Sequence, residues 1–316
     1  MVDAFAPSGP REHLLARAVL YGQLRDFFAA RGVLEVETPQ LATSFVSDPF
    51  IEPIIAKSGE QTLYLQSSPE YAMKRLLAAY GECIYALGKV FRAGERGRRH
   101  NPEFTLLEWY RIGFDDRQLM AEVAALITSV LPGTPVHYLS YRQWFMQAFA
   151  LDPHQAHQAQ LQQLAAGLIE IDGSGLDTNA WLDLLVTHIL EPQLPTGLTF
   201  VYDYPISQAA LARIVPDDTG QPVARRFEAF LGGMELANGY WELTDAAEQR
   251  RRFEADLATR RARNLPQYPL DENLLAALEQ GLPSCAGVAL GVDRLLMQMT
   301  GASRIAEVLS FDSSRV

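Results

Sequence analysis

Three segments of the chain hold charged and aromatic side chains whose spacing could serve chemistry. The first, residues 91–110, reads FRAGERGRRHNPEFTLLEWY and is predicted to form a strand, a charged loop and a returning strand. Arg92 could hold a phosphate or a carboxylate in a two-pronged contact, and Phe104 could stack on a planar base. Glu108 and Tyr110 share a strand face with Phe104, because side chains alternate along a strand, and together they would suit a ligand ammonium. The alternative is a surface hairpin with scattered charges.

The second segment, residues 226–245, carries three glutamates in an otherwise apolar strand pair. Glu228 and Glu235 flank a Gly-Gly kink, and Glu242 follows an Asn-Gly pair. Buried carboxylates are costly unless a positive partner meets them. Mg²⁺ with a nucleotide, or a bound ammonium, would be such a partner. Alternatively, these glutamates lie on the solvent-exposed face of an antiparallel sheet. That interpretation is plausible for any one of them, but less so for all three.

The third segment, residues 287–297, reads GVALGVDRLLM. Gly287 and Gly291 would let a backbone approach a ligand closely. The glycine spacing does not match the dinucleotide-binding fingerprint, and no strand–helix–strand unit surrounds it. We expect a strand that ends in a helix, with Arg294 pointing at a phosphate.

The elements that must position these residues can be predicted from periodicity. Helical spacing predicts helices at residues 12–31, 70–80, 116–131 and 246–263, the last with a solvated face. Alternating and β-branched residues predict strands at 33–36, 62–66, 83–87, 89–92 and 104–112, and β character returns from residue 199. Residues 150–200 are predicted to be a helical insertion on a single domain that spans residues 1–316. Since strands and helices do not alternate regularly, the predicted fold class is α+β, with a mostly antiparallel sheet flanked by helices.

Composition excludes several classes of protein. The 316 residues include 27 basic and 38 acidic ones, and a net charge of −11 disfavours non-specific nucleic-acid binding. Two cysteines, Cys83 and Cys285, exclude a disulfide scaffold and fit a reducing cytoplasm. No apolar segment predicts a secretory signal or a membrane span, so we expect a cytoplasmic protein. His154 and His157 lie one turn apart, but no third ligand is spaced to join them, so solvated histidines are expected.

Together the three segments resemble the catalytic domain of a class II aminoacyl-tRNA synthetase, most closely the lysyl branch. HNPEFTLLEWY, ELANGYWELTDA and GVALGVDRL are similar to its motif 2 return strand, its amino-acid-binding strand and its motif 3. FFAARGVLEVETPQL is similar to motif 1, with Pro39 where that family forms its dimer interface. The resemblance covers nearly the whole chain apart from residues 150–200. It implies the class II synthetase catalytic fold and a homodimer.

The position of motif 1 differs from that in lysyl-tRNA synthetases and indicates a smaller group within the family. Motif 1 lies so near the start of the sequence that we expect no anticodon-binding OB domain before it. A catalytic domain without that module resembles the bacterial elongation factor P–lysine ligase family, to which SSPEYAMKRLL, GERGRRHNPEF and CAGVALGVDR are also similar. This implies ATP and Mg²⁺ as cofactors, (R)-β-lysine as substrate with α-lysine as a weaker one, and elongation factor P as the partner that receives it on a lysine side chain. It also implies that tRNA is not a substrate.

The resemblance assigns roles by motif position, with Arg92 and Arg294 as the catalytic cations. Around ATP, Arg92 is expected to contact the α-phosphate and the substrate carboxylate, and Arg294 and His100 the outer phosphates. Phe104 is expected to contact the adenine. Glu228 and Glu235 are expected to bind Mg²⁺. Around the amino acid, the expected contacts are Glu70 to the near amino group, Asn238 beside the carboxylate, Tyr240 along the alkyl stem, and Glu108, Tyr110 and Glu242 to the distal ammonium.

Two positions depart from the family pattern. Motif 2 normally has Glu two residues after its Arg, but Gly94 stands there and Glu95 comes one residue later. Because a one-residue shift reverses the side-chain direction on a strand, either the hairpin adjusts locally or Glu95 has another task, and we assign it no nucleotide contact. Ala289 stands where the lysyl-tRNA synthetase motif has Gly. Its methyl would narrow the pocket in favour of an amino acid whose amino group sits one carbon further along.

Two other functions stay open. A short tRNA-charging enzyme is opposed by the acidic charge and by the expected lack of an anticodon-binding module. A non-catalytic binding protein is opposed by the retained charged residues of the ATP site, although Gly94 leaves this reading open. Arg96, Arg98 and Arg99 form the densest basic loop beside the expected site. They either help to receive an acidic protein partner or contact ATP only.

Overall fold

The computed structural model describes residues 5–171, 173 and 175–316. Its strands are β1 (Leu34–Glu35), β2 (Leu41–Ala42), β3 (Ile55–Ser58), β4 (Gln61–Leu65), β5 (Ile84–Phe91), β6 (Glu103–Ile112), β7 (Val136–Ser140), β8 (Leu198–Tyr204), β9 (Ile214–Pro216), β10 (Pro222–Leu231), β11 (Met234–Trp241) and β12 (Cys285–Gly291). Its α-helices are α1 (Arg11–Ala29), α2 (Glu70–Tyr80), α3 (Asp116–Val130), α4 (Tyr141–Phe149), α5 (Gln158–Ala166), α6 (Thr178–Leu185), α7 (Ala246–Ala262), α8 (Glu272–Gly281) and α9 (Val292–Thr300). Shorter helical turns are η1 (Val186–Leu190), η2 (Glu191–Gln193), η3 (Ile206–Gln208) and η4 (Ile305–Val308).

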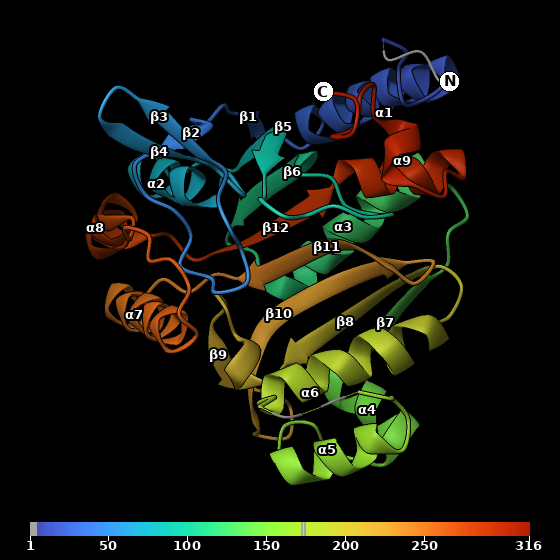
Figure 1. The fold of residues 1–316 in the computed structure, drawn as a ribbon, viewed down its shortest axis with the longest axis vertical. Helices are drawn as coiled ribbons and strands as arrows, with labels where there is room; N and C mark the ends of the chain where they lie inside the picture. The colour runs from blue at the N-terminus through green and yellow to red at the C-terminus, as the bar shows by residue number, and fades with distance from the viewer. Residues whose placement is uncertain (1–4, 172, 174) are drawn as a thin grey trace.

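A nine-stranded sheet forms the centre of the molecule (Figure 1). Its strands follow the order β1-β5-β6-β12-β11-β10-β8-β7, with β9 paired to β10. The pairs at the two ends, β1–β5 and β7–β8, are parallel, and all the pairs between them are antiparallel. A second sheet, β2-β4-β3, has three antiparallel strands. The expected α+β class, with a mostly antiparallel sheet flanked by helices, is confirmed.

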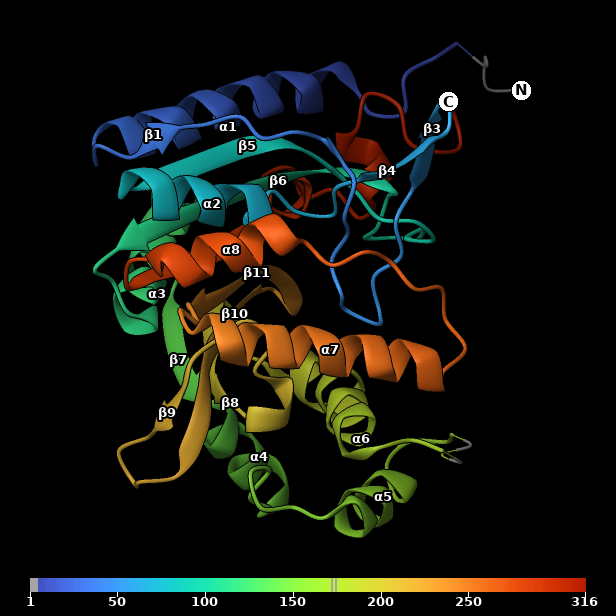
Figure 2. The same cartoon turned by 90° about the vertical axis from the view of Figure 1, so that its left-hand side faces the viewer.

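The two faces of the sheet have different partners. Leu107 and Trp109 of β6 are fully buried in the core that α1, α3 and α9 form on one face. Glu108 and Tyr110 alternate with them and therefore lie on the opposite face. Tyr110 packs there in a second core with residues of α2, α7 and α8, and Figure 2 shows these three helices side by side. One face of the sheet is thus covered by a hydrophobic core, while the other face carries polar side chains such as Glu108 beside a second core.

Helix α2 begins and ends where the sequence predicts. The Oγ of Ser68 accepts a hydrogen bond from the backbone N–H of Glu70 at 3.0 Å, which satisfies a free donor at the first turn. Gly81 then ends the helix with φ +64°, a conformation that glycine adopts at little cost. The two strands predicted at 83–87 and 89–92 are one continuous strand, β5, because Gly88 keeps its pairing with Leu106.

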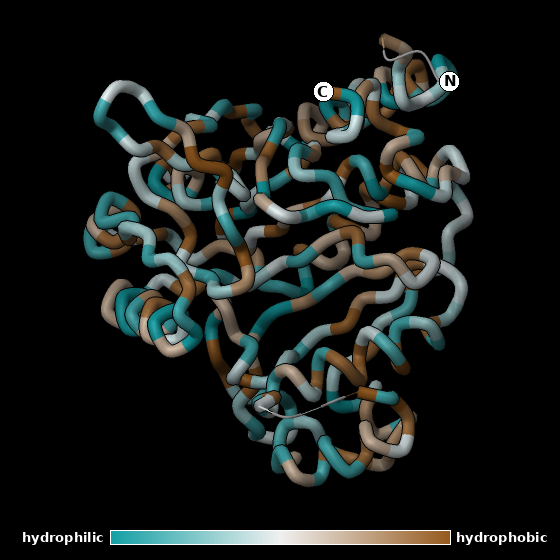
Figure 3. Tube along the Cα trace, viewed as in Figure 1, coloured by the Kyte–Doolittle hydropathy of each residue, from teal (hydrophilic) through white to brown (hydrophobic). Residues whose placement is uncertain are grey.

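Helix α7 has the solvated face that was expected, and its opposite side is buried. Gln249, Phe253 and Arg260 are buried, and Figure 3 shows hydrophobic residues interspersed with hydrophilic ones along the helix. The Arg260 guanidinium donates to the main-chain oxygen of Asp48 at 2.9 Å and to Glu52 Oε1 at 2.5 Å. These acceptors offset the cost of burying the charge and fix the loop before β3 against α7.

The segment predicted as an insertion lies at one end of the molecule (Figure 1). Its helices α5 and α6, with α4, pack against β8 and β10 around a core that includes Trp144, Phe145, Trp181 and Leu185.

Within the described part of the chain, no three His, Cys, Asp or Glu residues are grouped as a metal site, so His154 and His157 gain no third ligand. Among the same residues, none of the helices combines the length and the apolar character that a bilayer span requires.

Candidate active site

Strand register places six of the expected site residues in two neighbouring rows across one face of the sheet. Direct neighbours in the first row are Glu108, Ala289, Asn238 and Glu228, from β6, β12, β11 and β10. Direct neighbours in the second row are Tyr110, Gly287, Tyr240 and Arg226, from the same strands. Since residues two apart share a strand face, the two rows lie side by side. The sequence analysis expected these residues in the site except Arg226, which it missed.

The β5–β6 hairpin brings Arg92 and Phe104 together as predicted. The Arg92 guanidinium lies 5.1 Å from the centre of the Phe104 ring. Gly94 adopts φ +77°, and Glu95 Oε1 then lies 3.5 Å from Arg92 Nη1. Glycine tolerates the left-handed conformation that the hairpin adopts at this position. Glu95, to which the sequence analysis assigned no nucleotide contact, is therefore a neighbour of Arg92.

His100, Glu235 and Arg294 meet although they come from three different elements. Arg294 Nη2 lies 2.8 Å from His100 Nε2, and Arg294 Nη1 donates to the Glu235 main-chain oxygen at 2.9 Å. Glu235 Oε2 is 3.5 Å from the same guanidinium. Burial and the Arg294 charge lower the pKa of His100, so its neutral ring can accept a hydrogen bond from the arginine.

Glu228 has a partner that the sequence analysis missed. Arg226 Nη2 lies 2.5 Å from Glu228 Oε1, and its Nε donates to Asn238 Oδ1 at 3.3 Å. Burial raises the pKa of Glu228 to about 7, and the Arg226 charge opposes that rise. Arg226 therefore links an expected Mg²⁺ ligand to the amide expected beside the substrate carboxylate.

The expected ammonium site is built around Glu108, which is 2 % exposed. Tyr110 donates its hydroxyl to Glu108 Oε1 at 2.8 Å, and Ser68 donates to Oε2 at 2.7 Å. Burial, followed by the nearby Glu70 charge, raises the pKa of Glu108 to about 8. A second cation close to this carboxylate would favour its ionised form.

Lys74 is the least expected member of the site. Its Nζ lies 2.6 Å from Glu70 Oε1 and 2.7 Å from Glu242 Oε2, and the side chain is 2 % exposed. Burial alone would lower the pKa of Lys74, but Glu242 and Glu70 raise it above its ordinary value. Burial raises the pKa of Glu242 to about 7, against the pull of Lys74. The only sequence signal was a lysine inside the apolar run YAMKRLL, four residues after Glu70.

The expectation that Gly287 and Gly291 admit a ligand needs correction. A Cβ at Gly287 would lie 2.2 Å from Tyr110 Cε1 and 2.5 Å from Glu242 Oε1, so this glycine makes room for two side chains of the protein itself. A Cβ at Gly291 would meet Arg294 at an ordinary 3.7 Å. Gly287 is therefore the sterically required position of the two.

The basic loop is held by its own contacts. Arg98 Nε donates to the Ser303 main-chain oxygen at 2.9 Å, and Arg99 Nη1 donates to that of Gly233 at 3.2 Å. Arg96 is exposed and, with Arg98, lines a cavity of about 580 Å³ between this loop and the C-terminal segment. Of the three arginines, Arg96 alone makes no hydrogen bond to a main-chain oxygen in the described part of the chain.

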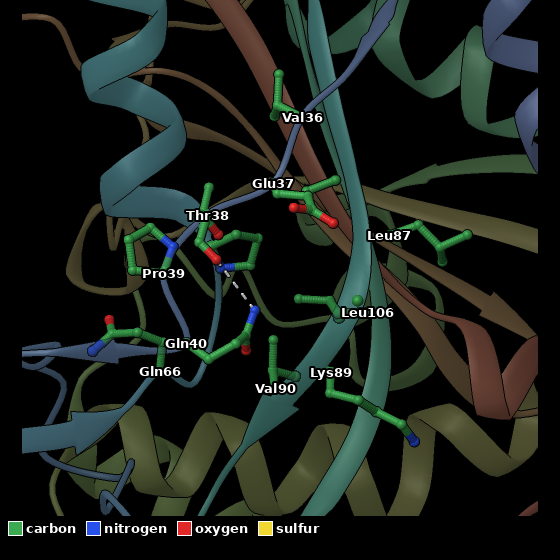
Figure 4. A pocket seen from close by; sticks show the side chains of 13 residues that line it. Val36, Glu37, Thr38, Pro39, Gln40, Gln66, Leu87, Lys89, Val90 and Leu106 are labelled. Carbon is green, nitrogen blue, oxygen red and sulfur yellow. Dashed lines mark hydrogen bonds between the residues drawn. The ribbon is translucent and has the colours of Figure 1, made fainter.

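A second cavity, of about 280 Å³, lies beside the motif 1 segment (Figure 4). Glu37, Thr38, Pro39 and Gln40 line one side, and residues of β5 and Leu106 line the other. Gln40 donates to the Thr38 main-chain oxygen at 3.5 Å, as Figure 4 shows. None of the residues expected to bind ATP or the amino acid lines this cavity, so we do not assign a substrate to it.

Known proteins with similar sequences identify the family of this chain. The family model for class II tRNA synthetases (D, K and N) matches residues 3–315. A protein of Klebsiella pneumoniae subsp. pneumoniae named elongation factor P–(R)-beta-lysine ligase is 48 % identical over 98 % of this chain and 97 % of its own length. A protein of Yersinia enterocolitica with the same name is 46 % identical over 99 % and 98 % of the two chains. The chain therefore belongs to the class II tRNA synthetase family of the D, K and N type, in the branch that holds these ligases.

Proposed function

We propose that this protein is an ATP-dependent, AMP-forming ligase that activates (R)-β-lysine and transfers it to a lysine side chain of elongation factor P. The name shared by relatives that are 46 to 48 % identical over almost the whole chain supports this proposal. The observation that carries it is the pair of rows on the sheet. Beside these rows lie two arginines, Arg92 at Phe104 and Arg294 at Glu235. Two carboxylates, Glu108 and Glu242, lie next to Tyr110.

On the nucleotide side, Phe104 is proposed to stack on the adenine. Arg92 is proposed to hold the α-phosphate and the substrate carboxylate, and His100 and Arg294 the outer phosphates. The Arg92 and Arg294 charges offset the negative charge that develops on the phosphates as pyrophosphate leaves, and they hold the reactants in line. No nucleophilic side chain is needed, because the substrate carboxylate itself attacks.

Glu228 and Glu235 are the residues that would hold Mg²⁺. Two carboxylates on adjacent strands fit this ion, which takes one or two protein carboxylates and fills its other positions with phosphate oxygens and water. When bound, Mg²⁺ neutralises charge on the phosphates.

The amino-acid side is proposed to take a diamino acid in an extended pose. Glu70 receives the near amino group and Asn238 lies beside the carboxylate, while Tyr240 packs along the alkyl stem. Glu108, Tyr110 and Glu242 surround the distal ammonium. We expect α-lysine to be a weaker substrate, because the Ala289 methyl projects between Glu108 and Asn238 in the first row.

The reaction then has two steps. A carboxylate oxygen of β-lysine attacks the α-phosphorus of ATP, which forms the aminoacyl-adenylate and releases pyrophosphate. The neutral amine of a lysine on elongation factor P next attacks the adenylate carbonyl, which forms an amide and releases AMP. Because a free lysine has a pKa near 10.4, that amine must lose a proton on arrival.

We further propose a homodimer in the cytoplasm. Leu15 and Val19, four residues apart on α1, are half exposed or more, as is Leu34 of β1, and these apolar side chains support an interface near motif 1. The two cysteines are free thiols, which supports a reducing compartment. The whole of residues 1–316 is proposed to act as one catalytic unit.

The deciding experiment is intact-mass analysis of elongation factor P incubated with the enzyme, ATP, Mg²⁺ and (R)-β-lysine. We expect a mass gain of one β-lysyl group, which depends on ATP and is smaller with α-lysine. A parallel incubation with tRNA and no elongation factor P should yield no charged tRNA. Charged tRNA with unmodified elongation factor P would support the tRNA-charging alternative, and no reaction with either would support the binding protein.

A further inference from the structure

Three acidic side chains surround the place proposed for the two amino groups, and one lysine lies among them. Glu108 and Glu242 are 2 % and 1 % exposed, and Glu70 lies at the start of α2. Lys74 bridges Glu70 and Glu242 through contacts of 2.6 Å and 2.7 Å. With all four groups charged, the pocket carries three negative charges and one positive charge.

The other groups around Lys74 do not change this balance. Tyr71 and Cys285 approach Lys74 from α2 and β12, and Tyr110 approaches the three glutamates from β6. Burial raises the pKa of each of these groups, so they stay neutral. Arg213 approaches Glu242 from outside the pocket. Its guanidinium donates to the Glu242 main-chain oxygen at 2.7 Å and to the hydroxyls of Thr244 and Ser284, not to the Glu242 carboxylate.

Part of the acidic surface is left for a ligand. Glu242 Oε1 is buried and has no hydrogen-bond partner in the described part of the chain, and it lies beside Gly287 and the Tyr110 ring. A buried carboxylate oxygen without a partner is costly. A bound ammonium would satisfy it.

We propose, on the basis of the proposed function, that Lys74 is a specificity-determining residue. Its ammonium, 2.7 Å from Glu242 Oε2, favours the ionised form of Glu242 and cancels one of the three negative charges. The pocket therefore presents two negative charges to the two ammonium groups of a diamino acid. A methionine could fill the same buried volume, and burying an ion pair is rarely favourable for stability by itself. The ammonium therefore acts through the charges that it balances.

The Lys74→Met variant removes the charge and keeps the length of the side chain. Without that ammonium Glu242 would hold its proton at neutral pH, and a protonated carboxyl binds an ammonium poorly. We expect the KM for β-lysine at pH 7 to rise about tenfold or more, since each unit of pKa rise cuts the ionised fraction about tenfold. The KM should fall again as the pH is raised toward about 9, while kcat and the KM for ATP stay near their wild-type values. Arg75→Met, at the exposed neighbouring position on α2, is the matched control and should change none of these.

A second variant keeps the proposal testable if Lys74→Met fails to fold. Glu242→Gln alone leaves one net negative charge and an underpaired Lys74 that repels the substrate. Lys74→Met combined with Glu242→Gln removes both charges of the buried pair and restores two net negative charges. We therefore expect the double variant to bind β-lysine more tightly than Glu242→Gln, as measured by calorimetry with each purified protein.

The outcomes separate the two proposals. A wild-type enzyme that does not activate β-lysine would overturn the proposed function itself. Suppose instead that the wild-type enzyme activates β-lysine, but that Lys74→Met raises the KM for β-lysine and the KM for ATP equally and at every pH. Lys74 would then be only structural. A double variant that binds β-lysine no better than Glu242→Gln would overturn the charge-balance role in the same way.

Discussion

Glu228 and Glu235 lie on the same face of the sheet because β11 carries one extra residue opposite β10. Glu235 pairs with Phe230, two residues from Glu228, whereas a regular ladder would pair it with Leu231, three residues away. The bulge leaves Leu236 without a partner, and Leu236 is buried in the core on the other face. Without this bulge the Glu235 side chain would point away from Glu228.

Both carboxylates should therefore act on one metal ion. Replacing either by glutamine, Glu228→Gln or Glu235→Gln, is expected to raise the Mg²⁺ concentration for half-maximal adenylate formation by roughly tenfold or more. Pyrophosphate exchange titrated with Mg²⁺ measures this. Glu103→Gln is the control, because Glu103 is an exposed residue of β6. An effect confined to one of the two glutamates would contradict a shared ion.

The space above Gly287 yields a prediction about stability. Gly287→Ala would place a methyl 2.2 Å from the Tyr110 ring, and both Tyr110 and Glu242 would have to move. We expect the free energy of unfolding to fall by about 1–3 kcal/mol, as for other overpacked cores, together with a higher KM for β-lysine. Denaturant titration and pyrophosphate exchange measure the two effects. Gly167→Ala, at an exposed position with φ −83°, should leave both unchanged.

Much of this site could be predicted from the sequence because strand periodicity is a local property. Phe104, Glu108 and Tyr110 are separated by even numbers of residues, so their common face follows from the alternation of side chains. The hydrogen bond from Tyr110 to Glu108 confirms that Glu108 and Tyr110 meet. Ser68 marked the start of α2 for a similarly local reason, since its hydroxyl meets the N–H of Glu70.

The remaining features depend on how separate elements meet. The bulge at Leu236 depends on how β11 pairs with β10, and the side-chain pattern of β11 alone does not reveal that pairing. Arg226 and Lys74 look like ordinary surface charges until their carboxylate partners are brought from elsewhere. Gly287 looked like a ligand-contact glycine, because nothing in its own segment indicates that Tyr110 occupies the space beside it.

The raised pKa values of Glu108, about 8, and Glu242, about 7, predict proton release when substrate binds. Both carboxyls are partly protonated near pH 7, and two ammonium groups would drive them to ionise. Calorimetry of β-lysine binding in two buffers with unlike ionisation enthalpies should give different apparent enthalpies. The Glu108→Gln variant should release fewer protons. Equal enthalpies in both buffers for the wild type would exclude this linkage.

The same pKa shifts have a defined sign for stability. A carboxyl whose pKa is raised in the folded state holds more protons than it does in the unfolded chain, so its contribution is fully present at acid pH. It is lost as the pH rises through about 7 for Glu242 and about 8 for Glu108. Without substrate, the free energy of unfolding should therefore decline across this window, and Glu108→Gln should flatten the decline.

The position of Ala289 between Glu108 and Asn238 predicts a change of selectivity. Ala289→Gly would widen the pocket beside the backbone end of the amino acid and should raise the activation of α-lysine relative to β-lysine. A methyl-sized change shifts discrimination by about 1–3 kcal/mol. Pyrophosphate exchange with both amino acids measures the ratio, and an unchanged ratio would remove Ala289 from the specificity argument.

The basic loop allows the two steps of the reaction to be separated. Arg96 is exposed, whereas Arg98 and Arg99 hold the loop through main-chain oxygens. If Arg96 receives an acidic partner, Arg96→Glu should slow transfer to elongation factor P about tenfold or more through charge repulsion, while adenylate formation stays near wild type. Arg98→Glu should impair both steps, because it also releases the contact with Ser303. An equal loss of both steps in Arg96→Glu would instead assign Arg96 to the nucleotide, since Arg96, unlike Arg98, makes no main-chain hydrogen bond that holds the loop in the described part of the chain.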